Sequence, residues 1–267
     1  MNFQNKHVAI TGAGSGLGRA LAQELSQLGA ILYLSDIDVD GLAHTAKLLS
    51  APVHTAIVDV SKAESVVSWK MEIEAHTSFL DVLFNNAGVT ILDRFEDHSL
   101  LDWEWVLGVN LWGVIHGIRT FLPMLKKSQK GWIVNISSIF GIIALPSQAA
   151  YCASKFAVRG ISEVLWEELS DIGVSVVHPG GIATNIVQRA RSHNDSYKGA
   201  LVRFFEKQTL APEEAARRII NGVSKEKKRI MVSKEAVLFD RVKRALPIVG
   251  NRWCADKIMQ AMGVQKL

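Results

Sequence analysis

The chain has 267 residues, of which 48% are hydrophobic and 21% charged, with a net charge of +4; these values are typical of a globular domain with one large core. No apolar run is long enough to cross a bilayer, and neither the two cysteines nor the eight histidines have the spacing of a disulfide scaffold or a metal site. We therefore expect a cytoplasmic protein without a catalytic metal, and no secretory signal, because a predicted strand begins at His7.

Short apolar runs alternate with longer amphipathic runs along the chain. The predicted strands are His7–Thr11, Ile31–Ser35, Val53–Val58, Asp81–Phe84, Gly131–Ile136, Val174–His178 and Arg229–Val232. The predicted helices are Gly16–Gly29, Asp38–Leu49, Lys62–His76, Ser99–Lys126, Ala150–Ser170, one that Pro212 opens, and a helical tail interrupted by Pro247 and Gly250. Strands that are apolar on both faces predict a doubly wound parallel sheet with helices on both sides, in a single domain.

The C-terminal part differs from the rest in pattern and in charge. Residues 181–210 show no strand and mix polar with aromatic residues, so we expect a functional flap over about 185–210. Residues 213–267 carry 13 lysines and arginines against 6 acidic residues, a net +7. Because these charges alternate with apolar residues at helical spacing, we predict solvent-exposed helix faces and no nucleic-acid partner. Contact with a membrane surface is the less favoured alternative.

The stretch TGAGSGLG at 11–18 lies between a predicted strand and a predicted helix, where phosphate-binding loops occur. It does not fit the pattern G-x-G-x-x-G, because Leu17 or Arg19 occupies the place of the third glycine. It does fit T-G-x-x-x-G-x-G, and Gly14 is then an extra glycine outside the pattern. The matching residues are Thr11, Gly12, Gly16 and Gly18.

Asp36 ends the second predicted strand, 18 residues after Gly18. A carboxylate at that position can accept hydrogen bonds from an adenosine ribose and repels a 2′-phosphate. Ile37 and Ser15 stand where an NADP enzyme would carry a basic residue. The sequence therefore favours NAD over NADP, although Asp36 could also simply cap the next helix.

A second motif places Tyr151 and Lys155 four residues apart, on one face of a predicted helix. Ser138 lies 13 residues before Tyr151, at the end of a predicted strand, and Asn110 lies in an earlier helix. Together with the glycine loop, these motifs resemble the short-chain dehydrogenase/reductase family over about residues 7–184. The resemblance implies a seven-stranded Rossmann-type fold, with the cofactor bound within about residues 1–184. The remaining residues, 211–267, would then form a helix, a strand and the basic tail.

The resemblance also implies a role for each matching residue. Tyr151 would act as the general acid and base, Ser138 would hold the substrate oxygen, and Asn110 would order a water beyond Lys155. The Lys155 ammonium and the cofactor's positive ring are expected to lower the pKa of Tyr151. The residues assigned to the cofactor are Gly12, Ser15, Gly16, Leu17, Gly18, Asp36, Ile37, Asp59, Val60, Asn86, Ala87, Gly88, Tyr151, Lys155, Ile182 and Thr184.

The substrate is expected to be an apolar alcohol or ketone, such as a lipid-, steroid- or acyl-chain-like molecule, because apolar residues follow the catalytic motifs. The candidate lining residues are Ile139, Phe140, Leu145, Ile186, Val187, Phe204 and Phe205. The alternatives are an NADP-dependent carbonyl reductase, a non-catalytic NAD(H)-binding regulatory module, and an epimerase or dehydratase. The resemblance further implies a homodimer or homotetramer, paired through the helices at 99–126 and 150–170.

Overall fold

The computed structural model describes residues 1–50, 52–184, 186–192, 198, 199, 202 and 210–263. Its strands form one sheet in the order β3-β2-β1-β4-β5-β6-β7, and every neighbouring pair is parallel. The strands are β1 His7–Thr11, β2 Ile31–Asp36, β3 Val53–Ile57, β4 Val82–Asn85, β5 Trp132–Ile136, β6 Gly173–His178 and β7 Arg229–Met231. The seven-stranded, doubly wound Rossmann-type fold is therefore confirmed.

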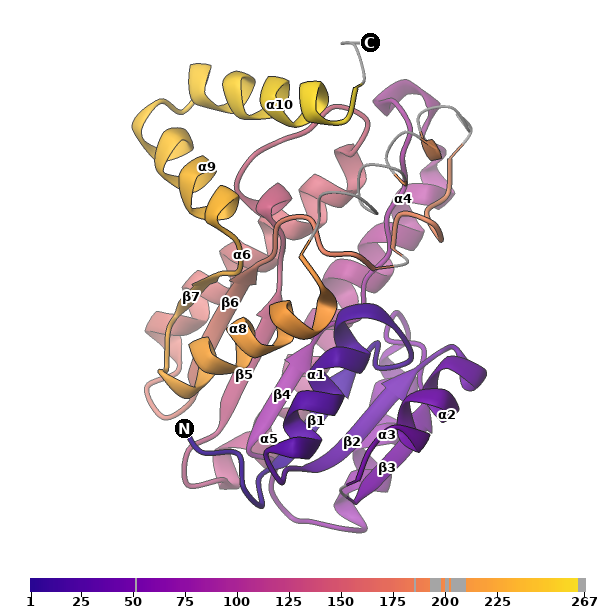
Figure 1. The fold of residues 1–267 in the computed structure, drawn as a ribbon. Helices are drawn as coiled ribbons and strands as arrows, with labels where there is room; N and C mark the ends of the chain where they lie inside the picture. The colour runs from indigo at the N-terminus through magenta and orange to yellow at the C-terminus, as the bar shows by residue number, and fades with distance from the viewer. Residues whose placement is uncertain (51, 185, 193–197, 200–201, 203–209, 264–267) are drawn as a thin grey trace.

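The helices connect these strands on both faces of the sheet (Figure 1). They are α1 Gly16–Gln27, α2 Val39–Lys47, α3 Ala63–Glu74, α4 Leu100–Leu107, α5 Gly113–Lys127, α6 Ala149–Glu168, α8 Pro212–Ser224, α9 Lys234–Ala245 and α10 Val249–Ala261. Short helical turns occupy Phe95–Asp97 and Ile139–Gly141. In the described part of the chain, no helix has the length and apolar character needed to span a membrane.

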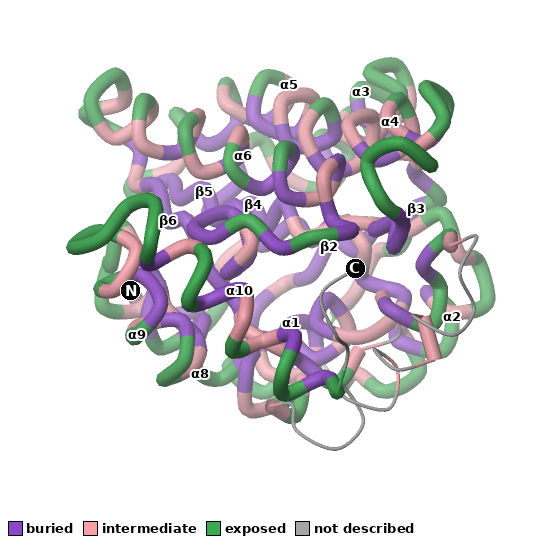
Figure 2. The backbone as a smooth tube through the Cα atoms, turned by 90° about the horizontal axis from the view of Figure 1, so that it is seen from above, coloured by how far each residue is buried: buried purple, intermediate pink, exposed green. Residues whose placement is uncertain are grey.

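Alternating side chains of the strands enter two separate cores, as expected for a pleated sheet with a period of two. Val8 and Ile10 pack with α1, α2 and α8, whereas Ala9 packs with α3, α5 and α6 on the opposite face. Viewed from above, the central strands are buried and the outer sides of the helices are exposed (Figure 2). Burial on both faces explains why the strands are apolar throughout.

The long helix expected over residues 99–126 is interrupted. A π-helical segment, Gly108–Trp112, separates α4 from α5. Helical periodicity is nearly the same through such an insertion, so the sequence pattern could not reveal it. Asn110 lies inside this segment and is fully buried.

The C-terminal helices α9 and α10 form a cap beyond the carboxyl ends of the strands (Figure 1). Ala255 and Met259 of α10, with Met262 directly after it, pack in one cluster with Leu145 and Val187. From α9, Ala236 and Phe239 pack against the segment that follows Ser138, at Ile139, Ile142 and Ile143. The basic tail is thus amphipathic, with one face packed on the domain.

Candidate active site

The glycine loop turns sharply between β1 and α1 and presses against the segment after β4. Gly12 and Gly16 have φ angles of +68° and +50°, which side chains rarely allow. A Cβ on Gly12 would lie 2.7 Å from the Cα of Ala87, and one on Gly18 only 2.0 Å from the carbonyl oxygen of Gly12. The loop can have this shape only because these positions lack side chains.

Side-chain hydrogen bonds hold the loop to the sequence N-N-A-G, residues 85–88, at the end of β4. The Thr11 hydroxyl accepts from the backbone N–H groups of Asn86 (3.0 Å) and Ala87 (3.1 Å). The Asn86 amide donates to the carbonyl oxygens of Thr11 (2.8 Å) and Gly12 (3.1 Å). Two motifs that are 75 residues apart in sequence therefore form one rigid unit at the edge of the sheet.

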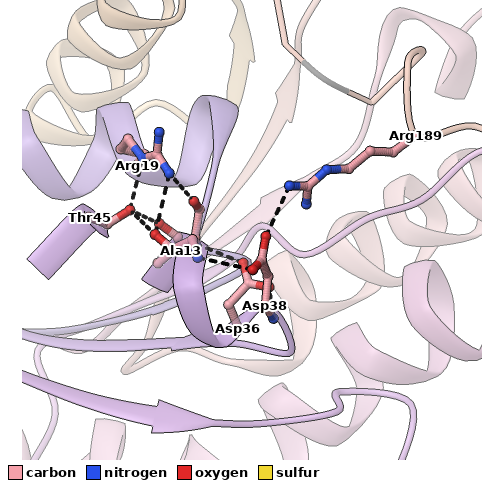
Figure 3. Close-up of polar contacts among 8 residues, drawn as sticks. Ala13, Arg19, Asp36, Asp38, Thr45 and Arg189 are labelled. Carbon is pink, nitrogen blue, oxygen red and sulfur yellow. Dashed lines mark hydrogen bonds and ion pairs between the residues drawn. The ribbon is translucent and has the colours of Figure 1, made fainter. Parts of the chain in front are cut away.

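Asp36 lies beside the same loop (Figure 3). Its carboxylate accepts from the backbone N–H groups of Gly14 (2.7 Å) and Asp38 (2.9 Å). A Cβ on Gly14 would lie 2.9 Å from the carboxylate oxygen of Asp36. Gly14 is therefore not an incidental extra glycine, since its missing side chain lets the loop and the carboxylate meet. Asp38, rather than Asp36, caps α2 by accepting from the N–H of Gly41.

Two arginines near Asp36 are engaged with other protein groups. The Arg19 guanidinium donates to the Thr45 hydroxyl (2.9 Å) and to the carbonyl oxygens of Gly14 and Gly41. Arg189 forms an ion pair of 2.9 Å with Asp38 (Figure 3). Ile37 is exposed. These neighbours of Asp36 were not identified from the sequence, because their partners lie up to 151 residues away.

The predicted adenine contacts lie at the next strand end. The Asp59 carboxylate accepts from the N–H (3.1 Å) and hydroxyl (2.6 Å) of Ser61. The Val60 carbonyl oxygen lies 3.0 Å from Nδ1 of His116, and the Val60 side chain packs where Gly113 leaves room. Both residues therefore also fix the local chain, and Asp59 shapes the turn into α3.

At the carboxyl end of β5, on the other side of β4 from the glycine loop, lies Ser138. The helix α6 carries Tyr151 and Lys155 next to it. The Ser138 hydroxyl accepts from the N–H of Phe140 (3.1 Å). The Lys155 ammonium donates to the carbonyl oxygen of Ile136 (3.0 Å) and lies 5.6 Å from the centre of the Tyr151 ring. The structure thus brings together the three residues that the motifs predicted.

Burial governs the protonation of this group. It raises the pKa of Tyr151 to about 12, against a smaller opposing effect of the hydrogen bond with Ser138. It also lowers the pKa of Lys155 to about 8. The expectation that Lys155 lowers the pKa of Tyr151 is thus not met by the chain's own groups, because the desolvation of the buried phenolate outweighs them.

Asn110 connects the π-helical segment to the start of the loop after β4. Its side chain accepts from the N–H of Val89 (2.8 Å) and donates to the carbonyl oxygen of Val89 (2.9 Å) and the hydroxyl of Ser154 (3.1 Å). Ser154 directly precedes Lys155 on α6. A Cβ on Gly88 would lie 3.4 Å from the Asn110 oxygen and 3.5 Å from the Lys155 nitrogen, so Gly88 separates the two polar groups.

Two further residues support the site and were missed from the sequence. The Ser137 hydroxyl donates to the carbonyl oxygen of Lys155 (2.8 Å). His178, which is fully buried at the end of β6, contacts the carbonyl oxygen of Ser138 through Nδ1 (2.9 Å). Burial lowers the pKa of His178 to about 4, so its ring is neutral at pH 7 and Nδ1 carries the proton. In the sequence, His178 stands directly before Pro179 and Gly180, and nothing in that pattern predicts its contact with Ser138.

The residues expected at the nicotinamide end lie after β6. A Cβ on Gly16 would lie 3.0 Å from the Thr184 side chain, so Thr184 reaches the glycine loop. Ile182 is buried and pairs with Leu210 in an isolated bridge. The segment expected to be the flap therefore returns to the domain at its far end.

The expected substrate-side residues fall into two groups. Phe140 lies edge-on to Tyr151, with ring centres 6.3 Å apart. Leu145, Ile186 and Val187 join the apolar cluster beneath α10, and Ile139 packs against α9. Phe204 and Phe205 lie outside the described residues. The cap helices contribute Met259 and Met262 to the same cluster, which the sequence did not reveal.

The residues at the edge fit a dinucleotide. Within the described chain, Ser15 makes no side-chain cap at the start of α1, and the first turn has no acidic residue. The backbone N–H groups of Gly16, Leu17 and Gly18 thus open a helix whose positive end can take a pyrophosphate. By contrast, no group of three or more metal-ligating side chains occurs among the residues that the structure describes.

Comparisons with known proteins agree with this geometry. A family model described as short chain dehydrogenase matches residues 6–195. The oxidoreductase SadH of Mycobacterium tuberculosis is 41% identical over 254 residues, covering 92% of both chains. Human estradiol 17-beta-dehydrogenase 11 is 33% identical over 243 residues, covering 90% of this chain and 79% of that protein.

Solved structures give the same result. A short-chain dehydrogenase/reductase from Burkholderia phymatum in complex with NAD superposes with a TM-score of 0.85 at 31% identity, over 92% of this chain and 95% of that one. An alcohol dehydrogenase from Thermococcus sibiricus, complexed with 5-hydroxy-NADP, gives 0.75 at 27% identity, over 85% and 96%. This chain therefore belongs to the short-chain dehydrogenase/reductase family and is an oxidoreductase that acts on CH–OH groups with NAD(P).

Proposed function

We propose that this chain transfers a hydride between NAD and an apolar alcohol or ketone. The observation that carries the proposal is the convergence of Ser138, Tyr151 and Lys155 at the carboxyl end of β5, one strand away from the glycine loop of β1 across β4. Ligand sites of doubly wound sheets lie at this edge, where the strand order reverses.

Each residue of the group has a distinct task. Tyr151 takes the proton of an alcohol and returns it to a carbonyl in the reverse direction. The Ser138 hydroxyl, held beside the phenol, stabilises charge on the substrate oxygen. When bound, the cofactor supplies a hydride acceptor whose positive ring favours the phenolate of Tyr151. Lys155 holds the nicotinamide ribose, and Asn110 positions Lys155 through Ser154 and orders a water beyond it.

The other cofactor contacts follow the edge of the sheet. The loop residues Gly12, Ser15, Gly16, Leu17 and Gly18 would hold the pyrophosphate, and Asp36 with Ile37 would hold the adenosine ribose. Asp59 and Val60 would bind the adenine, and Asn86, Ala87 and Gly88 would contact the rest of the dinucleotide. Ile182 and Thr184 would hold the nicotinamide carboxamide.

The neighbours of Asp36 support NAD over NADP. Its carboxylate repels a 2′-phosphate, and Ile37 offers no cation to bind one. Arg19 already donates to three protein acceptors and Arg189 is paired with Asp38. Releasing either arginine for a 2′-phosphate would break these contacts.

The substrate side supports an apolar molecule. Phe140 lies against Tyr151, and Leu145, Val187 and Met259 form a continuous apolar cluster next to it. One relative is named an estradiol dehydrogenase, which is consistent with a bulky apolar alcohol. A site of this kind excludes water from the reacting oxygen and strengthens the contacts of Ser138.

A dimer or tetramer paired through the helices at 99–126 (α4 and α5) and 150–170 (α6) is part of the proposal. Trp112, Phe156 and Val164 are exposed on this side of the molecule.

The variant Tyr151→Phe tests the function. It keeps the ring but removes the hydroxyl, so turnover of alcohols should fall by about 10²–10⁴-fold. NADH binding, followed by fluorescence, should persist, because the glycine loop and Asp36 are unchanged. Turnover equal to that of the wild type would refute the assignment.

A further inference from the structure

The turn between α9 and α10 lies at a corner of the molecule (Figure 1), and it carries exposed apolar side chains. Six consecutive residues, 244–249, are exposed. Among them Leu246 is 55% exposed, Ile248 86% and Val249 67%. Side chains of this size seldom project together into water unless they contact a partner.

We call residues 244–249 the apolar tip, and Trp253 extends it along α10. It follows Val249 by one helical turn, on the same face, and is 40% exposed. Its ring lies edge-on to that of Phe239 on α9, with centres 6.2 Å apart. The buried faces of the two helices, including Ala236, Cys254 and Met259, fasten the tip to the domain. The exposed residues are therefore presented by a packed hairpin of helices.

The surroundings of the tip are basic. From Arg241 to Ala255 the sequence has four basic residues and no acidic one. Arg241, Arg244 and Arg252 are exposed, and Lys243 donates to the Pro247 carbonyl oxygen (2.7 Å), which holds the turn. The flanking acidic residues are Asp240 and Asp256. Asp240 is buried, pairs with Arg229 at 2.8 Å and lies 3.9 Å from Arg244. With two acidic and four basic residues, the stretch from Asp240 to Asp256 keeps a net charge of +2.

We propose that the α9–α10 turn docks on an anionic lipid bilayer. Apolar side chains at the tip would enter the interface, Trp253 would lie at its polar boundary, and the arginines would face the headgroups. A second copy of the chain fits less well, because a two-fold contact would bring the arginines of both copies together. Nucleic acid would leave Ile248 and Val249 without a partner.

The position of the tip determines which part of the domain a docked molecule would hold near the bilayer. The same helix α10 that starts at the tip packs through Met259 in one apolar cluster with Leu145 and Val187. A docked molecule would therefore hold this cluster close to the bilayer. The docking itself rests on the surface alone and is independent of the proposed reaction.

Flotation with vesicles tests the proposal. The full chain should bind vesicles of phosphatidylcholine and phosphatidylglycerol at low salt, release them at high salt, and not bind phosphatidylcholine alone. The double variant Ile248→Asp/Val249→Asp should lower binding by about tenfold or more, because it replaces inserted apolar groups with charges that also repel the lipid. Arg244→Glu/Arg252→Glu should have an effect of similar size.

Two matched variants serve as controls. Met71→Asp changes an apolar side chain that is 65% exposed on α3, and Lys126→Glu/Lys127→Glu reverses charges at the far end of α5. Both should bind vesicles as the wild type does. The proposal is overturned if the wild type does not bind anionic vesicles, if the controls lose as much binding, or if the tip variant turns an oligomer into monomers in sedimentation. That last result would assign the tip to a second copy.

Discussion

At the β1–β2 end of the site, glycines allow backbone segments to approach closely, whereas the β5–β6 end contains buried polar side chains. Gly12, Gly14 and Gly18 each adjoin groups that a Cβ would strike within 3 Å. At the other end Lys155 is 3% exposed and His178 is fully buried. The first end is fixed by backbone shape, and the second by hydrogen bonds that offset the cost of burying polar groups. Substitutions and pH changes should therefore affect the two ends of the site in different ways.

The largest expected effect is at the glycine end. Gly18→Ala places a methyl group 2.0 Å from the Gly12 carbonyl oxygen, and backbone on both sides must move. We expect a loss of about 3 kcal/mol in the free energy of unfolding, measured with urea, and loss of NADH binding.

Gly160→Ala is the matched control within one copy of the chain, because no atom apart from its chain neighbours and the backbone of its own helix lies within 4 Å of the added Cβ. Unfolding is measured where the chain is monomeric, since Gly160 shares the exposed face of α6 with Phe156 and Val164. Gly160 lies within α6, where alanine should raise stability by about 0.5–1 kcal/mol. If Gly18→Ala folded and bound NADH as well as Gly160→Ala, the backbone account of this end would be wrong.

The buried polar end should instead show a pH dependence. The pKa of His178 falls from 6.5 to about 4 because of burial. Below about pH 6.5 the unfolded chain binds a proton at this histidine, whereas the folded chain does not. The contribution of His178 to the free energy of unfolding is therefore complete above about pH 6.5 and is lost as the pH falls towards 4. The loss from this group is about 3 kcal/mol by linkage.

His178→Asn tests this dependence, since an amide can still donate to Ser138 but does not titrate. Urea unfolding at several pH values should show a shallower acid loss in the variant than in the wild type. His44→Asn, at an exposed position on α2, should keep the wild-type slope. An unchanged slope in His178→Asn would contradict a neutral buried ring.

The smallest effect concerns the choice of cofactor at the glycine end. With Asp36 present and the neighbouring Arg19 and Arg189 already engaged by other protein groups, NADPH should bind about tenfold more weakly than NADH, a difference of about 1.4 kcal/mol. Ile37→Arg adds a cation at a position that is 67% exposed and should remove most of this difference. Met71→Arg, on α3, should leave it unchanged. Equal binding of the two cofactors by the wild type would count against the proposed role of Asp36.

The same contrast explains what the sequence could predict. Glycine spacing, the acid at the end of β2 and the Tyr151–Lys155 pair are local patterns, and the structure places them together as expected. Other contacts join segments that are distant in sequence, so no local pattern predicts them. These are the hydrogen bond from Gly14 to Asp36, the hydrogen bonds that Arg19 donates, and the contact of His178 with Ser138. The raised pKa of Tyr151 likewise comes from burial, which spacing does not report.

The cap was the least predictable region. Its helices appeared only as a basic amphipathic tail, although α10 completes the apolar cluster beside the site. Helical spacing shows that one face is apolar but not what that face will cover. The π-helical segment around Asn110 was hidden for a similar reason, since an inserted residue leaves the periodicity nearly intact.

Direct transfer of hydride is the central claim, and label transfer tests it most directly. The wild-type chain would be incubated with NAD and an apolar secondary alcohol that carries deuterium on its carbinol carbon, and the mass of the NADH formed would be measured. We predict that the NADH carries the deuterium and that Tyr151→Phe forms almost none of it. NADH without deuterium would contradict the account.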